Sequence, residues 1–274
     1  AVGAKVLASN TTGINNAGFG GETDTFGAAL QDNTTGSNNS AFGYNALHAN
    51  TTGANNTALG YTSLDANTTG GSNVGLGWNA LSANTTADYN VAIGTRAAET
   101  NTTGTQNVAV GGLALRYNTT ASYNTAVGYL ALTANTTGDQ HVAVGRQALL
   151  ANTTGNQNTA LGLNAMLANT TGDNNVAVGH AALDANTTAD NNTAVGKSAL
   201  GANTTGHSNT VVGAYAADAL TEGTLNTVIG INALGADTLG SRAVAIGRLA
   251  LGTQNFTSAT ANYNVAMGYA AGGQ

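Results

Sequence analysis

The sequence Asn-Val-Ala-Val-Gly-Gly-Leu-Ala-Leu-Arg-Tyr-Asn-Thr-Thr-Ala-Ser-Tyr, residues Asn107–Tyr123, is the unit from which this chain is built. It contains a short apolar triplet, a glycine pair, a second apolar segment at Leu113–Leu115 and a polar Asn-Thr-Thr turn. The pattern begins again at Asn124, 17 residues later. An unbroken period of this size is the signature of a stacked repeat architecture.

Two sets of residues keep this period over most of the chain. The glycine that follows the triplet recurs at Gly43, Gly60, Gly77, Gly94, Gly111, Gly128, Gly145, Gly162, Gly179, Gly196, Gly213, Gly230 and Gly247. The asparagine that opens the polar turn recurs at Asn33, Asn50, Asn67, Asn84, Asn101, Asn118, Asn135, Asn152, Asn169, Asn186 and Asn203. We therefore expect a regular repeat domain over residues 32–252.

The two ends depart from the period. Residues 1–31 are predicted to form an irregular first segment with an insertion at Gly21–Phe26, and residues 253–274 an atypical terminal coil with an insertion within Thr253–Ala261. Terminal repeats of solenoid proteins are commonly atypical.

The repeat predicts β-structure. The triplet alternates a larger residue, alanine and a larger residue, as in Val91-Ala92-Ile93, which is the period-two pattern of a strand. A repeat of 17 residues is too short for a helix and two turns, and helical repeats are longer. The prediction is an all-β, parallel β-solenoid (β-roll) of about fourteen coils, with two short strands per coil and a coil spacing of about 4.8 Å. Stacking would also place each turn asparagine on the next and form hydrogen-bonded Asn ladders.

One face of the predicted strand carries a column of small residues. Successive side chains of a strand point to opposite faces, so the alanines share one face and the larger residues the other. A long, uncharged, exposed column usually marks an interface. This pattern predicts side-by-side association of identical chains, most simply as a homotrimer; in the alternative, this face packs inside a wider single-chain coil. The predicted interface residues are Ala58, Ala92, Ala109, Ala126, Ala143 and Ala160.

The composition of the chain limits the partners and the cellular location that we expect. The 274-residue chain has a net charge of −6 and only seven scattered Lys and Arg residues, which argues against a nucleic-acid partner. No apolar run approaches the roughly 18 residues of a membrane span, so no membrane insertion is expected. The chain has no cysteine, few charges and abundant Asn and Thr. These features favour an extracellular, cell-surface or virion-surface protein.

Little in the sequence favours catalysis or metal binding. The four histidines, His48, His141, His180 and His207, come from distant coils and occupy different positions of the unit. One position of the unit is aspartate in four coils: Asp88, Asp139, Asp173 and Asp190. Calcium needs six or more oxygen ligands, and one carboxylate per coil is too few to supply them. We expect no enzyme activity, no catalytic residue, no metal site and no cofactor.

The Asn-Thr-Thr turns and the aromatic residues suggest surface functions. Each turn is an N-glycosylation sequon, with candidate acceptors at Asn50, Asn67, Asn84, Asn101, Asn118 and Asn135, although the same tripeptide is good turn chemistry. Ice binding is a further alternative, but adjacent threonines of a strand would point in opposite directions. Four aromatic residues follow the turn glycine and form a candidate surface for a sugar or receptor: Tyr44, Tyr61, Trp78 and Tyr129.

The run at Asn90–Gly94, Asn-Val-Ala-Ile-Gly, resembles the head repeats of YadA-like trimeric autotransporter adhesins. The region from Asn33 to Gly268 is also similar to repeat regions of phage tail-fibre proteins, although the adhesin coils are usually shorter. The resemblance implies β-rolls that trimerise and display a binding surface. We therefore expect a non-enzymatic extracellular rod, fibre or adhesin head. The alternatives are a receptor-, sugar- or ice-binding solenoid and a subunit that polymerises end to end into a filament.

Overall fold

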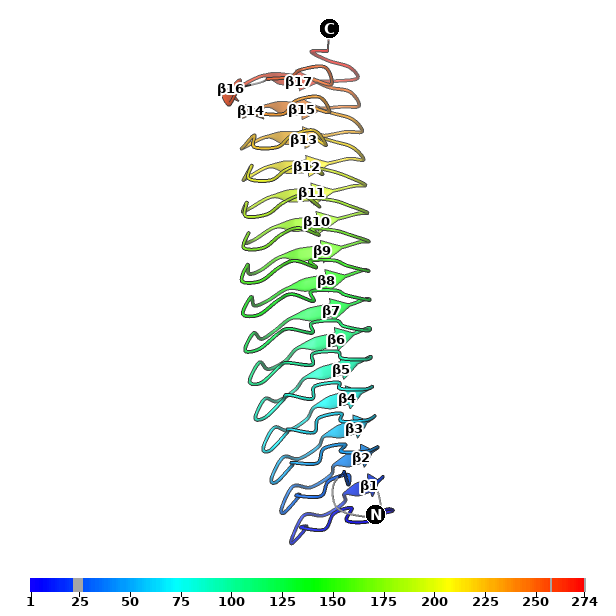
Figure 1. The fold of residues 1–274 in the computed structure, drawn as a ribbon. Coiled ribbons are helices and arrows are strands. Elements are labelled where there is room, and N and C mark those ends of the chain that lie inside the picture. Colours follow the sequence, from blue (N-terminus) through cyan, green and yellow to red (C-terminus); the bar gives the residue numbers. More distant parts are fainter. Residues whose placement is uncertain (22–26, 257, 274) are drawn as a thin grey trace. The chain divides into compact units, whose positions relative to one another are not determined.

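The structure is a computed structural model that describes residues 1–21, 27–256 and 258–273. In these ranges the chain is all-β, contains no helix and winds as a parallel β-solenoid of about 13 turns at a spacing of 17 residues. The predicted solenoid is confirmed (Figure 1). The chain divides into two compact units, Ala1–Asp139 and Gln140–Gln274. The insertion predicted at Gly21–Phe26 lies mostly outside the described residues.

The first unit contains one three-residue strand per coil, and each strand pairs in parallel and in register with the next. Val2 adds an isolated parallel bridge to Phe19. The strands are β1 (Ala17–Phe19), β2 (Ser40–Phe42), β3 (Thr57–Leu59), β4 (Val74–Leu76), β5 (Val91–Ile93), β6 (Val108–Val110) and β7 (Thr125–Val127).

The second unit continues the same arrangement within its own residues, with parallel pairing from β8 to β13 and on through β15 and β17. A further two-stranded pair, β14 with β16, joins Gly240–Ser241 to Thr260–Ala261. The strands are β8 (Val142–Val144), β9 (Thr159–Leu161), β10 (Val176–Val178), β11 (Thr193–Val195), β12 (Thr210–Val212), β13 (Thr227–Ile229), β14 (Gly240–Ser241), β15 (Val244–Ile246), β16 (Thr260–Ala261) and β17 (Val265–Met267).

The second apolar segment of each coil is not a strand, so the expectation of two strands per coil is wrong. Asn45 and Leu47 both have left-handed backbones, with φ of 54°. A left-handed leucine is strained by about 1 kcal/mol or more. The conformation turns the Leu47 N–H toward the next coil, where it donates to the Ser63 carbonyl at 2.9 Å. The segment therefore forms inter-coil hydrogen bonds without extending into a strand.

The glycine after each strand has a definite structural role. Gly60 has a φ of 140°, a region that side chains other than glycine rarely adopt. A Cβ on Gly60 would also lie 2.5 Å from the carbonyl oxygen of Gly77 in the next coil. The turn therefore needs glycine both for its backbone conformation and for close stacking.

Candidate functional site

The alanine column lies inside the coil, and the prediction of an exposed alanine interface is wrong. The central residue of each strand points inward, and the predicted interface residues have no solvent-exposed surface within the single chain: Ala58, Ala92, Ala109, Ala126, Ala143 and Ala160. The Ala-Leu pair of the second segment, such as Ala46 and Leu47, is also fully buried. The inner strand face carries small side chains, Ala or Gly in most strands and Val at Val211 and Val228. The structure instead agrees with the alternative interpretation of the sequence, in which this face of the strand packs inside the single-chain coil.

The turn asparagines also lie inside. Asn50 is fully buried, and its Nδ2 donates to Asn33 Oδ1 at 2.7 Å and to the Gly53 carbonyl at 2.9 Å. The same contacts recur from coil to coil and confirm the predicted Asn ladder. A buried amide nitrogen cannot carry a glycan in the folded coil. This burial excludes the candidate acceptors in the folded state: Asn50, Asn67, Asn84, Asn101, Asn118 and Asn135.

A second Asn ladder runs along the residue that precedes each strand. The backbone N–H of Asn73 donates to Asn56 Oδ1 at 2.9 Å, and Asn73 Nδ2 donates to the Ala87 carbonyl at 2.7 Å. Both side chains are fully buried. Buried polar groups are tolerated when they are hydrogen-bonded, and here two ladders satisfy polar groups inside the coil. The sequence analysis did not identify this second ladder, although its asparagines recur with the same period.

The aspartates that share one position serve as backbone acceptors. Asp88 Oδ1 accepts from the Gly71 N–H at 2.6 Å, and Asp190 Oδ1 accepts from the Asp173 N–H at 2.7 Å. Asp139 and Asp173 make the same contact with the preceding coil in their units. Among the described residues, no group of three or more His, Cys, Asp or Glu side chains is placed to hold a metal ion.

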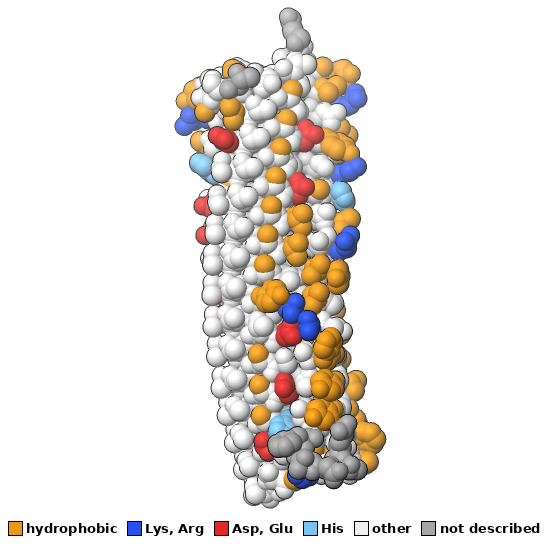
Figure 2. Space-filling view, viewed as in Figure 1, with side chains coloured by type: hydrophobic (Ala, Val, Ile, Leu, Met, Phe, Trp, Pro, Cys, Tyr) orange, Lys and Arg blue, Asp and Glu red, His pale blue; other side chains and the backbone are white. Residues whose placement is uncertain are grey.

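The outer face of the strands is uncharged and at least partly exposed, and its third position is apolar in every three-residue strand. It consists of the first and third residues of each triplet, which flank the buried alanine; Leu59 is 53% exposed and Leu161 47% exposed. Thr or Val, which have similar shapes, occupies the first position of most triplets. The strands with three residues contain no charged residue. Figure 2 shows hydrophobic side chains gathered along one edge of the molecule's visible face, with Lys and Arg side chains among them.

The aromatic residues lie at the corner where this outer strand face ends. Tyr44 and Tyr61 stack with ring centroids 5.1 Å apart and an interplanar angle of 10°. Trp78, in the next coil, is covered on one side by the guanidinium of Arg96, which lies 4.7 Å from the ring centroid. Tyr129 is exposed and packs beside Gly112, away from this group. The four candidate residues therefore form one cluster of three and a separate tyrosine.

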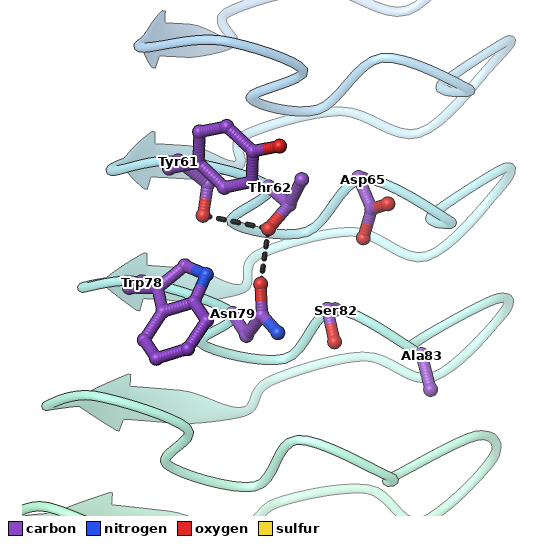
Figure 3. A pocket seen from close by; sticks show the side chains of 7 residues that line it. All are labelled: Tyr61, Thr62, Asp65, Trp78, Asn79, Ser82 and Ala83. Carbon is purple, nitrogen blue, oxygen red and sulfur yellow. Dashed lines mark hydrogen bonds between the residues drawn. The ribbon is translucent and has the colours of Figure 1, made fainter.

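A hollow opens next to Tyr61 and Trp78 (Figure 3). It has a volume of about 460 Å³, and its two rows of side chains come from the turns that follow β3 and β4. Thr62 donates a short hydrogen bond to Asn79 Oδ1, which ties the two rows together. The lining residues are Tyr61, Thr62, Asp65, Trp78, Asn79, Ser82 and Ala83.

Asp65 supplies the charge of this hollow. Burial raises the pKa of its carboxyl above the ordinary value, and hydrogen bonds from its own N–H and that of Ala66, with the nearby His48, oppose this rise. Its Oδ1 is shielded from solvent and has no hydrogen-bond partner in the structure. Figure 3 shows the carboxylate extending toward the row of Ser82. The carboxylate is therefore only partly satisfied by the protein.

The second unit contains a hollow of the same kind and the same volume, about 460 Å³. It is lined by Tyr215, Asp218, Asn232 and small residues at Gly235 and Gly252. Burial raises the pKa of Asp218 as it does for Asp65. The sequence analysis identified Tyr61 and Trp78 but missed Asp65, Asn79 and Ser82, because these positions vary between coils and carry no periodic signal.

The remaining observations do not assign the chain to a family. Comparison with protein-family models, with curated proteins and with solved structures finds no match. In the part of the chain that the structure describes, no helix is long and apolar enough to cross a membrane.

Proposed function

We propose that the chain is a non-enzymatic, extracellular structural protein that self-associates as a homotrimer through the outer face of its strands. One observation carries the proposal: the third residue of every three-residue strand is apolar and at least partly exposed, and no charged residue interrupts this outer face. Large exposed apolar patches usually mark interaction sites. The proposed interface is thus the strand face opposite to the alanine column.

The repeat itself favours a second copy as the partner. The outer side chains of each unit recur once per coil, at the strand spacing of about 4.8 Å. An identical face carries the same spacing, so ridges and gaps of the two faces can interdigitate over several coils. The resemblance of Asn90–Gly94 to trimeric adhesin heads and tail fibres supports the threefold arrangement and a place on a cell or virion surface.

Light scattering of the purified chain tests this proposal. We expect a mass three times the 26.9 kDa of one chain. Leu59→Lys combined with Ile229→Lys places one charge on the outer face of each unit and should yield single chains. The matched control is Thr52→Lys with Thr205→Lys, which adds the same charge on exposed turns and should leave the trimer intact.

Other outcomes would change the proposal. A wild-type mass of one chain at micromolar concentration would refute self-association. Long assemblies in negative-stain micrographs would show that the chain polymerises end to end and does not form a trimer. In that case the two lysine substitutions on the strand face should leave the assemblies unaffected.

A further inference from the structure

We infer that the hollow between Tyr61 and Trp78 is a binding site for a neutral saccharide, with the sugar ring against the aromatic side chains and its hydroxyl groups on Asp65, Asn79 and Ser82. The inference does not depend on self-association through the strand face, because the hollow is lined by the turns after β3 and β4.

The aromatic wall fits the flat face of a sugar ring. Tyr61 is 55% and Trp78 47% exposed, although each already has one aromatic or cationic neighbour. Tyr44 comes from the preceding coil and Arg96 from the following one, so these neighbours cover the pair from its outer sides. Aromatic faces are electron-rich and attract the C–H groups that line a pyranose ring.

The polar wall fits a rim of hydroxyl groups. Asp65 accepts hydrogen bonds, and a charged acceptor forms bonds about twice as strong as a neutral one. Asn79 Nδ2 has one long contact, 3.3 Å to Glu99 Oε1, so it retains donor capacity. Ser82 donates to the Glu99 carbonyl at 3.3 Å and can still accept. Because a sugar hydroxyl can both donate and accept a hydrogen bond, the hydroxyl groups of a sugar can bond to all three of these side chains.

The charges around the hollow exclude two other ligand classes. An anionic sugar would be repelled by the negative charge of the Asp65 carboxylate. A quaternary ammonium group would bind an aromatic cage, but Arg96 already lies 4.7 Å from the Trp78 ring and would repel a second cation there. The volume of about 460 Å³ lies within the ordinary range of small-ligand pockets.

The chain carries its own reporter for this site, because Trp78 is its single tryptophan. The full chain is titrated with cello-, malto-, manno- and chitohexaose up to about 10 mM, where a ligand with a Kd of about 1 mM is largely bound. We expect a saturable change in Trp78 emission with at least one of them. Choline chloride and hexagalacturonate are titrated in parallel and should give no saturable change.

Three variants locate the site. Tyr61→Ala and Asp65→Ala should each weaken binding about tenfold, as expected for loss of one aromatic or charged contact. Tyr129→Ala removes an equally exposed tyrosine at the same repeat position and should leave binding unchanged. Far-UV circular dichroism and thermal melting confirm that each variant is folded.

Three results would overturn the inference. The first is a flat response to all four neutral oligosaccharides. The second is saturation by choline or hexagalacturonate in their place. The third is an equal loss in Tyr61→Ala and Tyr129→Ala, which would place the sugar elsewhere. None of these results affects the trimer, whose mass is measured independently.

Discussion

The hydroxyl of Ser63 donates a hydrogen bond to the carbonyl oxygen of Gly75 at 2.7 Å, across neighbouring coils and inside the first unit. A Cβ on Gly75 would lie 2.6 Å from the same hydroxyl oxygen. In most other coils the two equivalent positions are both alanine, as in Ala114 and Ala126. The glycine and the serine are therefore a matched pair: the missing methyl group makes room for the added hydroxyl.

This pairing predicts strong coupling between two substitutions. Gly75→Ala alone should destabilise the fold by about 1–3 kcal/mol through overpacking. Ser63→Ala alone should cost about 1 kcal/mol, because the Gly75 carbonyl loses its hydrogen bond. The double variant recreates the common alanine pair and should be close to wild type. Urea denaturation of the four proteins gives the coupling energy.

The double-mutant cycle contains its own control. Contacting residues typically couple by 0.5–3 kcal/mol, whereas independent ones add within about 0.5 kcal/mol. If the double variant is as unstable as the sum of the two single variants, the matched pair is refuted.

The Gly75 position also shows what the sequence could and could not predict. The 17-residue period, the parallel strands and the Asn ladder follow from spacing alone, because stacking places equal positions on one another. The period does not say which strand face points inward. The larger residues at Leu59 and Ile93 suggest a core by hydrophobicity, yet they are exposed, because a 17-residue coil with two interior Asn ladders has space mainly for small side chains on the inner strand face.

The candidate site was predictable only in part. Tyr61 and Trp78 stood out because aromatic residues recur after the turn glycine. Asp65 and Ser82 occupy a variable position, and their proximity to the rings depends on left-handed residues such as Thr62 and Leu64, with φ of 53° and 54°. Nothing in the sequence marks a leucine or threonine as left-handed, so the turn geometry and the hollow required the structure.

The interior Asn ladder should contribute strongly to stability. Asn67 Nδ2 donates to Asn50 Oδ1 and to the Gly70 carbonyl, both at 2.9 Å, and its own Oδ1 accepts from Asn84. Asn67→Ala leaves these buried groups without a partner and should lower the free energy of unfolding by at least about 2 kcal/mol. Chemical denaturation measures the loss.

Thr69→Ala, two residues later on the exposed side of the same turn, is the control and should change stability by less than about 0.5 kcal/mol. Equal effects of the two substitutions would mean that the ladder contributes no more than an ordinary surface contact.

His141 takes the place of an asparagine in the second ladder. Its Nδ1 accepts from the Asn158 N–H at 3.2 Å, and its Nε2 lies 2.7 Å from the Gly155 carbonyl and donates to it. The imidazole thus reproduces both contacts of an asparagine amide. His141→Asn should keep wild-type stability within about 1 kcal/mol, whereas His141→Leu breaks both contacts and should cost about 2 kcal/mol.

Thermal melting of the two variants decides this prediction. A leucine variant as stable as the asparagine variant would show that packing, and not hydrogen bonding, holds the residue at this position.

Asp218 should make stability depend on pH in a defined direction. Burial raises the pKa of its carboxyl in the folded chain above its unfolded value, and the hydrogen bond from its own N–H only partly offsets this rise. The folded state therefore binds the proton more tightly, and the resulting stabilisation is fully present below the unfolded pKa. It is lost as the pH rises through the folded pKa.

The variant Asp218→Asn has no charge to bury, so it should match the wild type in acid and become more stable than it as the pH rises toward neutrality. Urea midpoints between pH 3 and pH 8 measure this difference. Glu222→Gln, which removes one charge from an exposed turn of the same unit, corrects for the change in net charge. An advantage of Asp218→Asn that grows as the pH falls would contradict the raised pKa, because it would mean that the folded state stabilises the ionised carboxylate.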